Sequence, residues 1–188
     1  MASSVHIKIS KFLSYVLRHK PEAIGLTLDA WGWADIDILL QKAREAGKFK
    51  TLDRSLIQKV VATNDKKRFV ISQDGQRIRA SQGHSIDVNL QLAPAEPPVF
   101  LYHGTATRFL DDILQKGLKR QQRHHVHLSQ DIETAIRVGQ RYGKPVILTV
   151  KAQLMYEQGF VFFLSDNGVW LTAHVPAAYL TRLADHRS

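Results

Sequence analysis

The spacing of apolar residues predicts three short helices in the first third of the chain. Apolar side chains recur at helical intervals from Ile9 to Leu17, from Ile36 to Ala46 and from Leu56 to Val61. Pro21 cannot continue the first helix, and Gly47 is a favourable residue just past the end of the second. We therefore expect three amphipathic helices that bury one face each.

A β-hairpin is predicted directly after the third helix. Residues 68–71 and 77–79 are typical of strands and flank Asp74 and Gly75, a dipeptide favoured in tight hairpin turns. Three helices followed by a hairpin are the element order of a winged helix. We expect this architecture for the first lobe.

A proline-rich segment separates this region from the rest of the chain. Pro94, Pro97 and Pro98 are three of the six prolines, and the segment around them can neither continue a helix nor lie in a central strand. The sequence therefore predicts two lobes, at residues 1–92 and 98–188.

The second lobe is expected to mix strands with fewer helices, so that the fold class of the whole chain is α+β. Gly117 closes one expected helix, which contains Leu110, Ile113 and Leu114, and a further helix is expected near residues 131–142. The expected strands lie at residues 99–102, 126–129, 145–151, 160–164 and 168–172.

Composition narrows the class of protein. The hydrophobic fraction of 44% is enough for packed cores, and apolar runs such as residues 146–150 are far shorter than the roughly 20 residues that span a bilayer. The chain has no cysteine, which excludes disulfides, a thiolate nucleophile and a zinc–thiolate site. The first residues show no basic stretch followed by an apolar one. We expect a cytoplasmic protein with no membrane partner; the sequence does not indicate its oligomeric state.

Charge favours a polyanionic partner for the first lobe. The formal net charge is +9. Residues 1–90 hold 15 Lys and Arg against 9 Asp and Glu, an excess of 6, whereas residues 91–188 hold 11 against 8, an excess of 3. The first lobe is therefore the better candidate for binding nucleic acid.

Common nucleotide-binding and hydrolytic signatures are absent. There is no glycine-rich dinucleotide fingerprint, and Gly143 and Lys144 are followed by Pro145 rather than by the Ser or Thr of a phosphate-binding loop. No close carboxylate pair and no serine in a strand–turn–helix elbow stands out. The candidate chemistry lies in Arg and His.

Basic side chains gather at two places in the first lobe. Arg18 and His19 lie at a helix end, where an arginine can bind phosphate through two N–H groups and a histidine can transfer a proton near neutral pH. Residues 64–68 and 77–79 put further cations around the hairpin, as a phosphate surface would. The alternatives are compensation of the helix dipole and solvated charges that deter edge pairing of the sheet.

Two places in the second lobe carry candidate binding residues. Residues 121–129 are rich in His, and strand alternation sends His125 and His127 to one face. A metal site is one interpretation, but no cysteine or nearby carboxylate completes a ligand set, and we expect no metal. Residues 101–105 are expected to end a strand in a glycine turn, which could approach a ribose or phosphate or be a turn only. Residues 167–172 are expected to form a turn and a buried strand.

Six segments in combination resemble the tRNA 2′-phosphotransferases of the KptA type. They occur in the order of that family and extend from Ser10 to Thr172. The resembling segments are residues 10–21, 63–69, 78–85, 102–105, 125–129 and 168–172.

The resemblance implies an N-terminal winged-helix lobe that binds RNA and a C-terminal ADP-ribosyltransferase-like lobe that binds NAD, with the reacting groups between them. It implies that NAD is consumed as a co-substrate. An internal 2′-phosphate of RNA attacks the nicotinamide ribose and expels nicotinamide, and the neighbouring ribose hydroxyl then attacks the phosphate. The essential Arg–His–Arg–Arg set of the family corresponds to Arg18, His19, Arg68 and Arg123.

The same resemblance implies a set of residues that contact the ADP-ribose part of NAD. They come from one predicted strand and the one next to it. These residues are His103, Gly104, Thr105, His127 and Ser129.

Two other functions are compatible with the sequence. One is an ADP-ribosyltransferase that stops after the first step and leaves ADP-ribose on a nucleic-acid phosphate. The other is a winged-helix protein that binds nucleic acid and senses NAD without turnover. Protein ADP-ribosylation is disfavoured, because residues 168–172 are apolar where many such enzymes carry a catalytic Glu. A phosphate oxyanion is already charged and needs no carboxylate to activate it.

Overall fold

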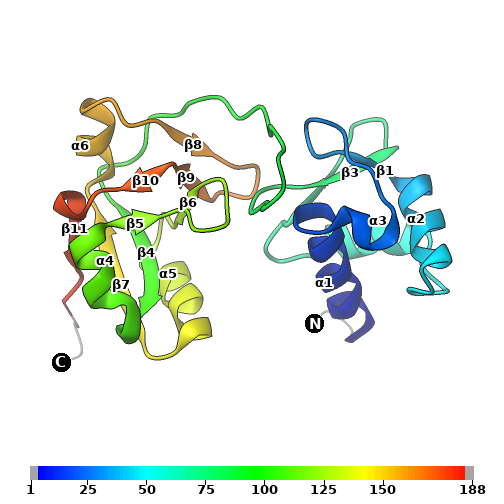
Figure 1. The fold of residues 1–188 in the computed structure, drawn as a ribbon, viewed down its shortest axis with the longest axis horizontal. Helices are drawn as coiled ribbons and strands as arrows, with labels where there is room; N and C mark the ends of the chain where they lie inside the picture. Colours follow the sequence, from blue (N-terminus) through cyan, green and yellow to red (C-terminus); the bar gives the residue numbers. More distant parts are fainter. Residues whose placement is uncertain (1–3, 185–188) are drawn as a thin grey trace. The chain divides into compact units, whose positions relative to one another are not determined.

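Two separate hydrophobic cores organise the chain. The structure, a computed structural model, describes residues 4–184. It divides into two compact units, Met1–Gln91 and Leu92–Ser188, whose helices and strands are labelled in Figure 1. Each unit has its own cluster of buried apolar side chains.

The first unit contains the three helices that were predicted from the sequence, which are thereby confirmed. The helices are α1 (Ser4–Arg18), the short 3₁₀ helix η1 (Pro21–Ile24), α2 (Ile36–Glu45) and α3 (Arg54–Ala62). Asp35 and Asp53 cap the amino termini of α2 and α3: the Asp35 carboxylate accepts two backbone N–H groups, and the Asp53 carboxylate accepts one. Apolar side chains at helical spacing, such as Ile9, Leu13 and Ile57, are fully buried in the first core.

A three-stranded antiparallel sheet completes the first unit. Its order is β1 (Ala34–Asp35), β3 (Arg77–Ala80) and β2 (Phe69–Ile71). The hairpin of β2 and β3 is confirmed, and β1 is an additional strand that the sequence did not predict. Ile78 and Ala80 are buried in the first core, so the alternate residues of β3 face away from it.

The second unit combines three small antiparallel sheets with short helices. One sheet has the order β11 (Leu180–Arg182), β7 (Pro145–Val150) and β4 (Leu101–Ala106); a second has β6 (Val126–Leu128), β9 (Trp170–Thr172) and β8 (Phe162–Leu164); the third pairs β10 (His174–Val175) with β5 (Leu118–Lys119). The helices are α4 (Leu110–Lys116), α5 (Ile132–Gly139) and α6 (Ala152–Glu157), with 3₁₀ turns η2 (Thr107–Phe109), η3 (Gln140–Tyr142) and η4 (Ala177–Tyr179).

The glycine turn predicted after Tyr102 is wrong. Strand β4 continues through Gly104 to Ala106, and Gly104 pairs with Ile147 of β7. Helix α5 packs directly on the strand here: a Cβ atom on Gly104 would lie only 1.7 Å from the backbone oxygen of Ala135, a residue of α5. The glycine therefore permits close packing of helix on strand.

The described part of the chain is a mixed α/β structure of helices and small antiparallel sheets, as the α+β expectation requires. Among residues 4–184, no helix is long and apolar enough to cross a membrane.

Candidate functional site

Arg18 and His19 lie where α1 ends. The backbone N–H groups of His19 and Lys20 both donate to the carbonyl oxygen of Tyr15, which closes the last turn before Pro21. The side chain of His19 is exposed, and its Nδ1 lies 2.9 Å from the hydroxyl oxygen of Ser85. The backbone N–H of Ser85 donates to the carbonyl oxygen of Arg18 at 2.9 Å. Ser85 thus fixes the chain at this helix end and can orient the imidazole.

Hydrogen bonds of both its backbone N–H and its carbonyl oxygen hold Arg68 at the start of β2. Its backbone N–H donates to Oδ1 of Asn64 at 3.3 Å, and its carbonyl oxygen accepts from the N–H of Ser81 at 2.9 Å. The Ser81 hydroxyl donates to the carbonyl oxygen of Lys67 at 2.8 Å. Lys67 has a φ of +42°, a left-handed conformation that is costly for a side chain with a Cβ atom. These contacts fix the backbone conformation of Lys67 and Arg68, and this conformation sets the position of the Arg68 Cβ atom.

The guanidinium of Arg18 connects the end of α1 with the Arg68 segment. Its Nη2 lies 3.5 Å from the backbone oxygen of Arg68, and a Cβ atom on Gly83 would lie 3.7 Å from its Nη1. The structure thus brings the Arg18 side chain, the Arg68 backbone and the His19–Ser85 pair together within the first unit. Arg18 and Arg68 are half-buried, so less of their charge is screened by water than on an open surface.

Sequence reasoning did not assign a role to Ser85, Asn64 or Ser81. All three lie in segments that carried the resemblance, and Asn64 also begins the basic segment 64–68. Their contacts join positions far apart in the chain: His19 with Ser85, and Asn64 with Ser10, whose hydroxyl lies 3.0 Å from the Asn64 amide nitrogen.

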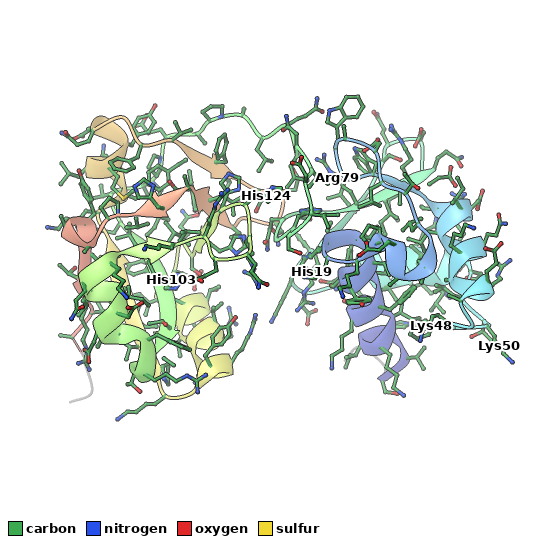
Figure 2. All side chains as sticks on the ribbon, viewed as in Figure 1. His19, Lys48, Lys50, Arg79, His103 and His124 are labelled. Atoms are coloured by element: carbon green, nitrogen blue, oxygen red, sulfur yellow. The ribbon has the colours of Figure 1, made fainter. Side chains whose placement is uncertain are left out.

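In the second unit, His103, Arg123 and His127 form a connected group. The Nδ1–H of His103 donates to the backbone oxygen of His127 at 3.1 Å, and Nη1 of Arg123 lies 2.6 Å from Nδ1 of His127. Arginine carries donors only, so Nδ1 of His127 must accept, and the proton of a neutral His127 is then on Nε2. Figure 2 shows His103 and His124 in the second unit and His19 in the first.

Burial lowers the pKa of His103 below the ordinary value for histidine. Desolvation is the larger cause, and the hydrogen bond to the His127 carbonyl oxygen acts in the opposite direction. At neutral pH the ring is therefore uncharged, with its proton on Nδ1 and a lone pair on Nε2. Such a ring can accept a hydrogen bond from a hydroxyl group of a sugar.

The other residues predicted to contact NAD have different surroundings. Ser129 exchanges two backbone hydrogen bonds of 2.8 Å with Tyr102, which join the end of β6 to β4. Thr105 is buried at 5% exposure, and Gly104 lies against the backbone of α5. The structure thus brings His103, His127 and Ser129 together where β4 meets the end of β6, and it places Gly104 and Thr105 in packing positions.

The remaining histidines of this region show no metal-binding arrangement. The ring of His125 lies 5.5 Å from the ring of Phe163, and its pKa is lowered by burial and, to a smaller extent, by His124 and Arg120. Among the residues that the structure describes, no group of three or more His, Cys, Asp or Glu side chains could hold a metal ion.

Strand β9 is buried along its whole length. The hydroxyl of Thr172 donates to the backbone oxygen of Val161 at 2.9 Å, which is a structural contact. The strand carries no carboxylate, so it offers no group that could activate a neutral nucleophile.

Comparison with known proteins identifies one family over almost the whole chain. Residues 4–174 match the family described as "RNA 2'-phosphotransferase, Tpt1 / KptA family". The "Probable RNA 2'-phosphotransferase" of Agrobacterium fabrum is 58% identical over 176 residues, which are 94% of each chain. Proteins of the same name from Pseudomonas fluorescens and Pectobacterium carotovorum are 57% and 56% identical over 97% and 96% of this chain and 100% and 96% of their own. The chain therefore belongs to the RNA 2′-phosphotransferase, Tpt1/KptA, family of transferases.

Proposed function

We propose that this protein removes an internal 2′-phosphate from RNA and transfers it to ADP-ribose taken from NAD. In the first step, a phosphate oxygen attacks the anomeric carbon of the nicotinamide ribose, the carbon–nitrogen bond breaks and nicotinamide leaves. In the second step, the adjacent ribose 2-hydroxyl attacks phosphorus and displaces the RNA 2′-oxygen, which gains a proton. The products are RNA with a 2′-hydroxyl and ADP-ribose 1″,2″-cyclic phosphate.

The observation that carries this proposal is the contact of Arg18 with the Arg68 segment beside His19. Attack on a phosphodiester concentrates negative charge on the nonbridging oxygens, and fixed guanidinium groups stabilise such charge. Arg18 and Arg68 are half-buried, and hydrogen bonds fix the backbone around both. They are the proposed phosphate-binding groups of the first unit, and Arg123 is the arginine proposed for this role in the second unit.

His19 is the proposed group that contacts the attacking ribose hydroxyl. Its exposed ring can reach a substrate, and the contact of the Ser85 hydroxyl with Nδ1 orients the ring. A positioned histidine can accept a proton near neutral pH, which is what the second step requires of a neutral hydroxyl.

His103, His127 and Ser129 are the proposed contacts for ADP-ribose in the second unit. A neutral His103 ring with its Nε2 lone pair suits a hydroxyl donor better than an anionic phosphate. Arg123 lies beside His127 and offers the positive charge that the phosphate needs. Gly104 and Thr105 contribute mainly through packing in this proposal.

The two units have different tasks in this proposal. The first, with three helices and a three-stranded sheet, acts as a winged-helix lobe that binds RNA, in keeping with its excess of six positive charges over residues 1–90. The second acts as an ADP-ribosyltransferase-like lobe that binds NAD.

A single reaction tests the proposal. Purified protein is incubated with NAD and an RNA oligonucleotide that carries one internal 2′-phosphate, and the products are separated by chromatography and mass spectrometry. The expected result is free nicotinamide, ADP-ribose cyclic phosphate and RNA lighter by one phosphate. The same RNA without the 2′-phosphate is the control and should release no nicotinamide.

The two alternatives give different products in the same reaction. Persistent RNA–ADP-ribose in the wild type would identify an ADP-ribosyltransferase that stops after the first step. Binding of RNA and NAD without release of nicotinamide would identify a nucleic-acid-binding sensor. Either outcome would contradict the proposed function.

A further inference from the structure

The outward face of the sheet in the first unit carries an aromatic ring in contact with two arginines. Pairing of Asp35 with Arg77 places Trp33, which precedes β1, beside Arg79. The guanidinium carbon of Arg79 lies 4.6 Å from the centre of the Trp33 ring, and that of Arg77 lies 5.5 Å from it. Because Ile78 is buried on the opposite face, this cation–π cluster faces away from the core.

A second tryptophan, Trp31, is presented by a turn that is already ordered. One carboxylate oxygen of Asp29 accepts the backbone N–H groups of Trp31 at 3.0 Å and Trp33 at 2.9 Å. Its other oxygen lies 3.7 Å from Nη1 of Arg77. Gly32 gives the turn its left-handed residue, with a φ of +82°. Trp31 nevertheless remains 43% exposed, an unusual position for a residue with so large an apolar side chain.

We call Trp31, Trp33, Arg77 and Arg79 the Trp–Arg surface. It lies next to the segment that borders Arg18 and His19. A Cβ atom on Gly32 would lie 3.5 Å from Nε2 of His84, and the neighbouring residues Gly83 and Ser85 contact Arg18 and His19, respectively. The Trp31 turn and the proposed phosphate-binding group are therefore linked through three consecutive residues of the first unit.

We propose that the Trp–Arg surface binds the single-stranded RNA that flanks the 2′-phosphorylated nucleotide. A base stacks on the exposed ring of Trp31, and a backbone phosphate pairs with Arg77, whose side chain is 43% exposed. Exposed aromatic rings beside cations are the combination with which proteins bind single strands without reading their sequence. This inference rests on the proposed function, since it extends the RNA site of the same reaction.

Charge favours RNA over a protein as the partner of this surface. The first 90 residues carry an excess of six positive charges, and two arginines lie within the surface itself. An apolar protein partner would have to bury the charge of Arg77, whereas an RNA backbone supplies opposite charge at regular spacing.

Binding of RNA without a 2′-phosphate tests the surface apart from catalysis. A fluorescently labelled oligonucleotide of about ten nucleotides, in the range of single-strand site sizes, is titrated with wild type, Trp31→Ala, Trp31→Phe and Arg77→Ala. Loss of one stacked base should weaken binding about 5- to 150-fold in Trp31→Ala. Trp31→Phe keeps a ring and should recover most of the affinity. Quenching of tryptophan fluorescence by RNA should be smaller in Trp31→Ala than in wild type.

Lys50→Ala is the matched control for charge. Lys50 is an exposed cation of the same unit, and Figure 2 shows it well apart from Arg79. It should lose less affinity than Arg77→Ala. Tyr156→Ala, which removes an aromatic side chain that is 39% exposed in the second unit, should bind as wild type. Thermal unfolding of every variant checks that each protein is folded.

Turnover separates this inference from the proposed function. With a long 2′-phosphorylated RNA, Trp31→Ala should raise KM and leave kcat near wild type; with a substrate too short to reach Trp31, the two proteins should behave alike. Unchanged RNA affinity and KM in Trp31→Ala, with normal turnover by wild type, would contradict the RNA-binding role of the Trp–Arg surface and leave the proposed function supported. Trp31-dependent RNA binding without any turnover would support the RNA-binding role of the surface and contradict the proposed function.

Discussion

The hydroxyl of Ser85 lies 2.9 Å from Nδ1 of His19 and orients that ring. We expect Ser85→Ala to slow the second step about 2- to 10-fold, as the loss of one net hydrogen bond would. His19→Ala should slow it about 10²- to 10⁴-fold, as the loss of a group that transfers a proton would. Arg68→Ala should also slow the second step more than the first.

Single-turnover reactions with labelled RNA measure both steps, because RNA–ADP-ribose accumulates when only the second is slow. Ser55→Ala, which changes an exposed serine of α3, is the matched control and should keep the wild-type rate. Equal slowing of both steps in His19→Ala would contradict the role proposed for this histidine.

The buried ring of His103 makes the stability of the protein depend on pH. Because burial lowers its pKa in the folded state, the unfolded state binds the proton more readily, and the free energy of unfolding falls as the pH drops below the ordinary value of 6.5. Above pH 6.5 the ring is neutral in both states, so protonation of His103 no longer lowers the free energy of unfolding. His103→Gln cannot titrate there, and its amide can still donate to the His127 carbonyl oxygen.

Urea unfolding from about pH 8 to about pH 5 measures this effect. We expect the unfolding midpoint of wild type to fall more steeply over this range than that of His103→Gln. Parallel curves would show that His103 is not shifted in the folded protein.

At the scale of elements, Asn64 joins α1 to the loop before β2. Its Oδ1 accepts the backbone N–H of Arg68, and its amide nitrogen donates to Ser10. Asn64→Ala removes both contacts and should lower the free energy of unfolding by about 1–3 kcal/mol, because a half-buried backbone donor loses its partner. Asn64→Asp keeps the acceptor and loses only the donor, so its second-step rate should lie between those of Asn64→Ala and wild type.

Chemical denaturation and single-turnover kinetics measure the two effects. Gln58→Ala, which changes an exposed side chain of α3, is the control and should alter neither. If Asn64→Asp and Asn64→Ala behave identically, the contact with Ser10 matters and the one with Arg68 does not.

Elements with a repeated local pattern were predictable, and elements made by distant partners were not. Helices α1 to α3 each bury a stripe of apolar residues that the sequence displays, and Asp74 with Gly75 marks the hairpin turn. Strand β1 has only two residues and exists through its pairing with β3, so no periodicity reveals it. The turn predicted at Gly104 failed because nothing local shows that α5 packs against the strand.

The candidate site was predictable to the same extent: a position marked by the local sequence was predicted, and contacts between distant residues were not. Pro21 shows that a helix ends near Arg18 and His19, and this position was predicted correctly. The contact of His19 with Ser85 spans 66 positions and depends on the folded path of the chain after β3. The course of the Arg68 segment depends on the left-handed Lys67, a residue type that gives no hint of such a conformation.

At the scale of the whole molecule, each unit has a core of its own. Leu148 is fully buried in the second core, and Leu148→Ala should lower the stability of the second unit by about 2–5 kcal/mol. Hydrogen exchange followed by mass spectrometry should then show faster exchange in β4 and β7, with α1 unchanged. An equal loss of protection in α1 would show that the two units unfold as one.

The contact of Gly104 with Ala135 restricts which sequences this fold can accept. A side chain at position 104 would meet backbone at 1.7 Å, and backbone cannot rotate away as a flexible side chain can. A Cβ atom on Gly159 would meet no atom within 4 Å beyond its chain neighbours, so only the φ of +90° restricts which residue can stand there. In a library randomised at both codons and selected for folded protein, position 104 should return glycine alone, whereas position 159 should also return asparagine.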